Sequence, residues 1–295
     1  MDLSTISQVV VNGLVSSVTV VLVALGVTIV FGIMHIINFA HGELYMLGSY
    51  GAWFFLGELL SKVWGANLVT YFIAMLITMV LVAVLGMLIE RGPLRQWHGK
   101  LLGSFIISMG FILILQSSAL GLFTGFDKRA RNPVPGIIEV GGVTLAYNRL
   151  MVIIVSIAII VALYLFMKQA KLGKAMRAVE QDREAAALQG VNYSRTCSLA
   201  MGIGCALASA AGSLLGIIFV INPWVGEATV LKAFTTVVLG GMGSFGGTII
   251  AGFIVGYTET LGTMYLGGGD VALMLVFGLM MLVLIIKPSG LFGHG

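Results

Sequence analysis

The sequence predicts an all-α, polytopic membrane protein with about eight or nine transmembrane helices, two broken segments and a cytoplasmic coupling helix. Hydrophobic residues make up 59% of the chain and charged residues only 9%, whereas soluble domains have roughly 25% charged residues. Several uninterrupted apolar runs approach or exceed the roughly 20 residues that cross a bilayer. The alternating pattern of membrane β-strands is absent from the sequence. We therefore expect one transmembrane domain, residues 1–295, surrounded by lipid.

The first two apolar runs, residues 9–33 and 45–57, are separated by a short polar stretch. It carries four polar side chains, those of His35, Asn38, His41 and Glu43. Non-helical backbone at membrane depth is tolerated only where it is buried in protein or lines a cavity. The stretch is therefore either a tight cytoplasmic turn or a break that lines a substrate path, and Asn38, His41 and Glu43 lie along the path in the second case. The two histidines are six positions apart, which does not fit one helical face that binds a metal.

Three further apolar runs, at 69–89, 101–123 and 150–167, predict the next spans. Ser104 and Ser108 lie inside the second of them, and we expect their hydroxyls to form hydrogen bonds across helices. The loop at 124–148 reads NPVPGIIEVGGVTLAYN in its middle, which predicts a turn and a small β-hairpin that bends at Gly141–Gly142.

The second half holds a span at 198–221, a shorter apolar run at 230–239, and spans at 248–266 and 271–286. The residues at 240–247 read GGMGSFGG, and a stable helix interior does not tolerate five glycines at about 1 kcal/mol each. This stretch predicts a second broken helix. Paired interruptions in two halves of a membrane protein indicate a transport site between them. The glycines that we place on the translocation path are Gly240, Gly241, Gly243 and Gly246.

Basic residues predict the orientation. The loops at 90–100 and 168–195 carry three and six Lys or Arg residues, and two spans separate them, so both should be cytoplasmic. The loop at 124–148 and the amino terminus then face outward.

The segment at 168–195 carries nine of the 28 charged residues, so it must face water. Its residues 174–189, KAMRAVEQDREAAALQ, are strong helix formers and predict one helix that ends at Gly190, a C-cap residue. Spacings of three and seven place Arg177, Glu180 and Glu184 on one charged face of that helix. A solvated loop helix is the alternative to a docking helix.

The motif EAAALQG at 184–190 resembles the EAA loop of ABC importer permeases, in which Glu-Ala-Ala is followed three residues on by Gly. The segments GKAMRAVEQDREAAALQGV, FGIMHIINFAHGELYMLGSY and LGGMGSFGGTIIAG resemble those of the branched-chain amino acid permeases, H-type subunit. The resemblance covers residues 10 to 290. It implies that Glu184, Ala185, Ala186 and Gly190 dock on an ATPase. The charged face adds Arg177 and Glu180 to the residues that we expect at this docking site. The downstream Ile-x-Leu-Pro of other EAA loops is missing here.

The resemblance also implies a bacterial inner-membrane importer of leucine, isoleucine and valine. Its expected partners are a second homologous permease subunit, two cytoplasmic ATPases and a periplasmic substrate-binding protein. The chain has no GxxxxGK[ST] motif, so we expect no cofactor of its own, with ATP and Mg²⁺ held by the partners. We expect neither enzymatic activity nor binding to nucleic acid.

Two alternatives stay open at this point. Within the same family, urea or a short-chain amide is the alternative substrate. In the other class, an ion-coupled secondary transporter would use a carboxylate within the membrane, for which Glu43 and Glu259 are the candidates.

Overall fold

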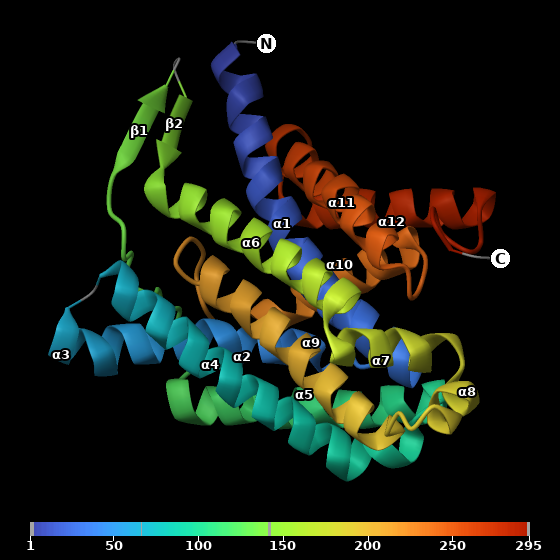
Figure 1. Cartoon of the computed structure of the whole chain (residues 1–295). Helices are drawn as coiled ribbons and strands as arrows, with labels where there is room; N and C mark the ends of the chain where they lie inside the picture. Colours follow the sequence, from blue (N-terminus) through green and yellow to red (C-terminus); the bar gives the residue numbers. More distant parts are fainter. Residues whose placement is uncertain (1–2, 66, 141–142, 294–295) are drawn as a thin grey trace.

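A computed structural model describes residues 3–65, 67–140 and 143–293 and consists mainly of long helices (Figure 1). Six helices in this part of the chain are long and apolar enough to cross a membrane. They lie at 6–34, 68–97, 101–123, 147–169, 193–215 and 269–286. The polytopic all-α class is thereby confirmed. Our expected count of eight or nine spans also includes α2, α10 and α11, which do not meet the same length and composition requirement.

In the described part of the first half, the α-helices are α1 (Leu3–Met34), α2 (His41–Phe54), α3 (Ser61–Trp64), α4 (Leu68–Ile89) and α5 (Leu101–Phe123). A π-helical stretch, Phe55–Leu60, joins α2 to α3, so the chain stays helical from residue 41 to residue 64. Asn67 caps the start of α4, because its Oδ1 accepts a hydrogen bond from Thr70 N. After α4, a π-helical stretch and then a 3-10 turn continue the helical chain to Trp97.

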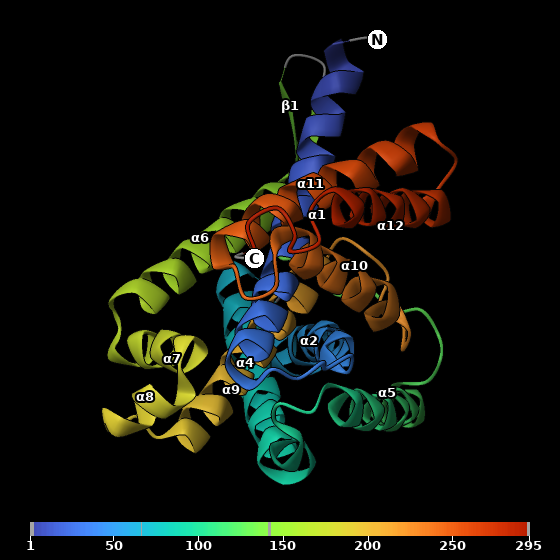
Figure 2. The same ribbon diagram turned by 90° about the vertical axis from the view of Figure 1, so that its right-hand side faces the viewer.

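The predicted hairpin is present. Strand β1 (Ile137–Val140) pairs antiparallel with β2 (Val143–Ala146), with Ile137 opposite Ala146. The predicted bend at Gly141–Gly142 lies outside the described residues. The hairpin and the amino-terminal end of α1 stand at the same end of the molecule (Figures 1 and 2).

The second half contains α6 (Tyr147–Gln169), α7 (Lys171–Gln181), α8 (Arg183–Leu188), α9 (Tyr193–Leu215), α10 (Val225–Gly240), α11 (Phe245–Tyr265) and α12 (Gly269–Ile286). Both predicted interruptions are present. The first covers residues 35–40, and the second is shorter than expected, because Gly246 and Gly247 already belong to α11 and only residues 241–244 are non-helical.

Helices α1 and α9 form the centre of the bundle. Helix α1 packs against α11, α9, α10 and α6, and Val18, Leu22 and Leu25 are fully buried along it. Several contacts bring backbones together at glycines: a Cβ added at Gly256 would lie 2.4 Å from Ser17 Cα, and one added at Gly48 would lie 2.3 Å from Ser209 O. Close van der Waals packing of this kind is what holds helices together in lipid.

Helices α5 and α12 lie at the periphery. In the apolar stretch of each of these helices, only 11% of the residues are buried within the chain, against 83% in that of α1. Large apolar side chains such as Leu102, Leu122 and Ile286 are exposed on them. These surfaces face either lipid or another protein chain.

Candidate functional site

The first break, residues 35–40, is a non-helical stretch that is hydrogen-bonded to α5. Helix α1 ends at Met34, and His35 takes a left-handed conformation with φ of 50°, after which the backbone no longer follows a helix. Ile37 N donates to Ser104 Oγ and Phe39 N donates to Ser108 Oγ, each at 3.2 Å. The two serines therefore do bond to another segment, as expected, but their partner is the backbone of the break.

The three polar residues that we assigned to a path at the first break are buried inside the chain. Asn38, His41 and Glu43 are 3%, 0% and 1% exposed. Within the described residues, Asn38 Oδ1, both ring nitrogens of His41 and Glu43 Oε2 have no hydrogen-bond partner. Gln116 Nε2 donates to Glu43 Oε1 at 3.1 Å and to Glu227 Oε1 at 2.9 Å, so Glu43 is not an isolated carboxylate.

The starts of α2 and α10 meet through a pair of glycines. A Cβ added at Gly42 would lie 2.3 Å from Gly226 O, and one added at Gly226 would lie 2.5 Å from Gly42 O. Phe39, just before α2, stacks on Phe234 of α10 with ring centroids 4.5 Å apart. The first break is thus in direct contact with the helix that leads into the second break.

The second break is a tight glycine turn. Gly241 and Gly243 have φ of 99° and 89°, values that side chains with a Cβ rarely adopt. Ser244 caps α11 by accepting from Gly247 N at 3.1 Å. The carboxyl-terminal residues return to this turn, because Leu291 N and Phe292 N donate to the carbonyls of Leu239 and Gly240.

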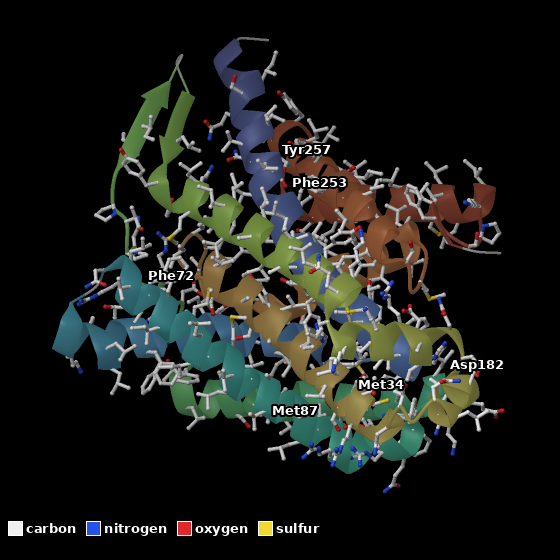
Figure 3. All side chains as sticks on the ribbon, in the orientation of Figure 1. Met34, Phe72, Met87, Asp182, Phe253 and Tyr257 are labelled. Atoms are coloured by element: carbon white, nitrogen blue, oxygen red, sulfur yellow. The ribbon has the colours of Figure 1, made fainter. Side chains whose placement is uncertain are left out.

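The predicted single helix at 174–189 is wrong. Asp182 has extended backbone angles, φ −155° and ψ 109°, and its Oδ1 accepts from Glu184 N and Ala185 N, so it ends α7 and begins α8 (Figure 3). The shared charged face of Arg177, Glu180 and Glu184 is therefore also wrong. Glu184 lies in the first turn of a new helix, where the helix dipole favours a negative charge.

Most of the surface of helix α8 is exposed. Glu184 and Ala185 are exposed, Ala186 is buried at 4%, and Leu188 is 88% exposed. Gly190 follows with φ of 81°, and its N–H donates to Ala187 O, which confirms the predicted C-cap position.

Glu180 points the other way, toward the bundle. A Cβ added at Gly32 of α1 would lie 2.6 Å from Glu180 Oε1, and one added at Gly243 would lie 3.1 Å from the same atom. A cavity of about 360 Å³ lies here, lined by residues of α1, α6, α7 and the second break. Burial raises the pKa of the Glu180 carboxyl, and nearby Arg177 partly opposes this. The structure thus brings together a residue assigned to ATPase docking and a glycine assigned to the path.

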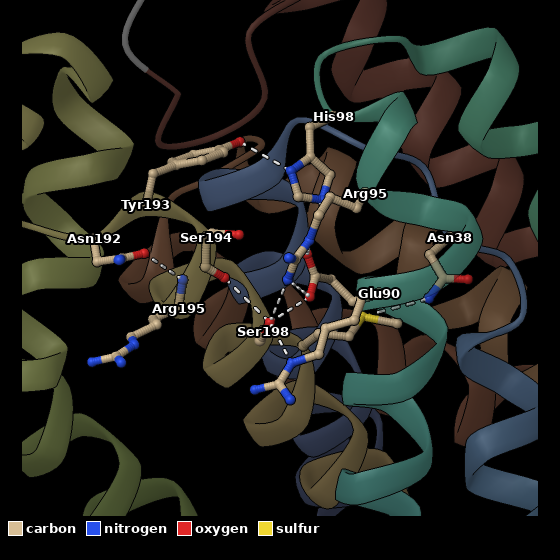
Figure 4. A network of polar contacts seen from close by, with 11 residues as sticks. Asn38, Glu90, Arg95, His98, Asn192, Tyr193, Ser194, Arg195 and Ser198 are labelled. Atoms are coloured by element: carbon tan, nitrogen blue, oxygen red, sulfur yellow. Dashed lines mark hydrogen bonds and ion pairs between the residues drawn. The ribbon is translucent and has the colours of Figure 1, made fainter.

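A buried carboxylate that the sequence reasoning missed ties the end of α4 to the start of α9 (Figure 4). Glu90 Oε2 lies 3.1 Å from Arg95 Nη2 and accepts from Ser198 Oγ at 2.5 Å. His98 Nε2 lies 3.4 Å from Glu90 Oε1, and the other ring nitrogen of His98 lies 3.3 Å from the Tyr193 hydroxyl. The basic turn at 90–100 and the segment at 168–195 therefore share one end of the molecule. The sequence did carry a signal for this ion pair: an acidic residue ends an apolar run, and an arginine follows it five residues later.

Glu259, the second candidate carboxylate of an ion-coupled carrier, is also paired. Its Oε1 lies 2.7 Å from Lys232 Nζ and its Oε2 accepts from Ser16 Oγ at 2.8 Å. Among the described residues, no group of three or more His, Cys, Asp or Glu side chains is arranged to hold a metal ion.

A family model and two relatives agree on the family to which the chain is similar. The family model described as "Branched-chain amino acid transport system / permease component" matches residues 9–284. The high-affinity branched-chain amino acid transport system permease protein BraD of Pseudomonas aeruginosa is 35% identical over 298 residues, which are 97% of this chain and 95% of that protein. The corresponding protein LivH of Escherichia coli K12 is 33% identical over 96% of this chain and 94% of its own length. Among solved structures, PsaBC from Streptococcus pneumoniae in complex with Fab has 15% identity and a TM-score of 0.49 over 95% of this chain and 92% of that one.

Proposed function

The chain belongs to the family of permease components of branched-chain amino acid transport systems, and from this we propose that it carries leucine, isoleucine and valine inward across the bacterial inner membrane. As a multi-pass permease of an ABC transport system, it is a transport subunit and not an enzyme. Uptake is driven by ATP that partner subunits hydrolyse.

The observation that carries the coupling part of this proposal is the exposed surface of α8. Leu188, with 88% of its surface exposed, lies one helical turn from the exposed Glu184 and Ala185. The three side chains are therefore free to contact another chain through one apolar group, one small group and one charge. We infer that Glu184, Ala185, Leu188 and Gly190 contact a cytoplasmic ATPase, whereas Glu180 of α7 faces the cavity beside α1, with the exposed Arg177 at its edge.

The remaining partners follow from the same family. The apolar surfaces of α5 and α12 suit a second permease subunit or lipid, and the end with the hairpin is where a periplasmic binding protein would deliver the substrate. Counting α2 with α3, and α10 and α11, as crossings gives nine in total. An odd number of crossings agrees with an amino terminus outside and a carboxyl terminus inside.

Co-purification of the ATPases with the variant Leu188→Gln tests the docking surface. The fold should be unaffected because the side chain has few contacts within the chain, and recovery of ATPase with the permease should fall several-fold. Leu266→Gln is the matched control, since Leu266 is 56% exposed at the turn after α11, at the end of the molecule opposite α8. Equal ATPase recovery with both variants would show that α8 is not the docking surface.

Uptake of labelled leucine by the complete importer tests substrate and energy source together. Uptake should require ATP, survive an uncoupler, and be inhibited by isoleucine and valine but not by urea or acetamide. Inhibition by the amides alone would assign the chain to the other substrate class. Loss of uptake with the uncoupler at constant ATP would favour an ion-coupled carrier.

A further inference from the structure

A second cavity, of about 470 Å³, lies between α1, α10 and α11 at the end of the bundle away from α7 and α8. Its walls come from α1, the amino-terminal half of α10 and the last turns of α11, which lie next to one another (Figures 1 and 2), and from residues at and just after the end of α9. The volume falls within the roughly 300–1,000 Å³ of small-molecule sites. By the orientation inferred above, this is the outward end, where a binding protein would deliver an amino acid.

An ion pair stands in the wall of this cavity. Lys232 of α10 and Glu259 of α11 are 2.7 Å apart, and their side chains are only 17% and 22% exposed. Ser16 of α1 donates to the other oxygen of Glu259 at 2.8 Å. One helical turn outward on α1, Arg149 of α6 donates to Asn12, which also lines the cavity.

An ion pair in such a place is weak evidence for a stabilising role. Replacing a buried ion pair with apolar residues of similar volume is often neutral or stabilising, because both charges must be taken out of water. Ionisable residues within membrane helices instead mark substrate and ion pathways by default. Both charged side chains also line the cavity, so both are within reach of a molecule inside it.

The rest of the wall is mainly apolar. Val15, Leu215, Ile218 and Val225 line it beside the ion pair. An amino acid with a branched aliphatic side chain carries the complementary groups: one carboxylate, one ammonium and one apolar side chain. Each substrate charge can replace one half of the Lys232–Glu259 pair, so the exchange leaves no charge unpaired.

We propose that this cavity is a transient zwitterion site of the permease, in which Lys232 binds the α-carboxylate and Glu259 binds the α-ammonium of the amino acid. The side chain lies against the apolar wall, and Ser16 holds Glu259 in place while its ion pair with Lys232 is open. The assignment rests on the proposed function for its ligand class, but the binding test below does not depend on transport.

Protection of a cysteine in the cavity tests the site directly. Ala228→Cys places a thiol in its wall, and Gln169→Cys places an exposed thiol at the far end of α6 as the matched control. The natural Cys197 and Cys205 are fully buried, so they do not interfere. The permease–ATPase complex is used in lipid nanodiscs without binding protein, with leucine as the probe. Leucine should slow maleimide labelling at position 228 and not at position 169.

Two comparisons decide whether the charges matter. N-acetyl-leucine amide keeps the isobutyl group and lacks both charges, so it should give no protection at position 228. In the double variant Lys232→Met with Glu259→Gln, the leucine concentration that halves the labelling rate should rise at least about tenfold, as expected for the loss of one or more charge-assisted contacts. The double variant removes both members of the Lys232–Glu259 pair together, so neither of the two is left without its partner, and the fold should be spared.

The outcomes separate the site from the transport function. Equal protection by leucine and its uncharged analogue, or unchanged protection in the double variant, would overturn the zwitterion site. Absence of any protection would overturn it as well, even if the unmodified importer takes up leucine. Charge-dependent protection without ATP-driven uptake would support the site and overturn the proposed function.

Discussion

At the scale of single residues, Glu180 connects parts of the chain that lie far apart in sequence. It stands on the amphipathic helix α7, yet its Oε1 lies in contact range of positions 32 and 243. The sequence assigns Glu180 to the charged outer face because helix-forming residues continue without interruption from 174 to 189. The cap formed by Asp182 changes the direction of the chain, so Glu184 begins a new exposed helix while Glu180 faces the cavity beside α1.

A buried carboxylate gives the clearest prediction at this scale. Glu90 has no exposed side-chain surface and pairs with Arg95, whereas Glu58 pairs with Lys62 on the surface. We expect Glu90→Ala to lower the free energy of unfolding by about 3 kcal/mol, at the lower end for a buried pair because Arg95 is partly exposed. Glu58→Ala should cost about 0.5 kcal/mol or less. Thermal unfolding of the two variants in the same detergent measures the difference, and similar shifts in Tm would contradict it.

At the scale of elements, apolar length predicts the helices well and their polar interruptions less well. Helix α5 begins and ends at the residues expected, 101 and 123, because both of its ends are marked by a change from apolar to polar sequence. The second break is shorter than its run of glycines, because Ser244 starts α11 as a cap and two glycines fit within the first turn of that helix. The hydroxyls that hold the first break could not be assigned from sequence, since their partners lie 67 and 69 positions away.

The second break itself gives a paired prediction. Gly243 has φ of 89° and faces Glu180, whereas Gly246 is helical and a Cβ added there would meet no atom within 4 Å. Gly243→Ala should therefore strain the turn by about 1 kcal/mol or more and slow ATP-driven leucine uptake several-fold. Gly246→Ala should transport at the normal rate. Uptake by the two reconstituted variants at equal permease content is the measurement, and equal rates would mean that the turn does not take part in transport.

At the scale of the whole molecule, composition predicts a membrane protein but not which helices lie inside. Helices α1 and α5 are both strongly apolar, yet α1 is mostly buried and α5 mostly exposed. Leucine and valine side chains are equally suited to contact with lipid and to contact with a neighbouring helix, so the apolar pattern does not distinguish a lipid-facing helix from a buried one. The small residues of α9 and α11, which allow backbone contact, were the better guide to the centre.

The orientation of the whole chain is tested by accessibility from the two sides. Gln169→Cys should react with an impermeant reagent only from the cytoplasmic side, and Arg131→Cys only from outside. Arg131 is preferable to the nearby Gly136, whose φ of 131° would strain any other residue. Labelling of position 169 but not of position 131 in intact spheroplasts would reverse the orientation.

The hydrogen bonds from the backbone of residues 35–40 to serine hydroxyls of α5 allow two amide protons to report whether α5 stays in contact with the first break. Ile37 and Phe39 have no helical or strand partner, and Ser104 and Ser108 of a peripheral helix accept their hydrogen bonds. Their hydrogen exchange is therefore slow only while α5 stays against the break. Any step of the cycle that draws α5 away from the bundle would appear first as faster deuterium uptake at these two amides, before any helix has unfolded.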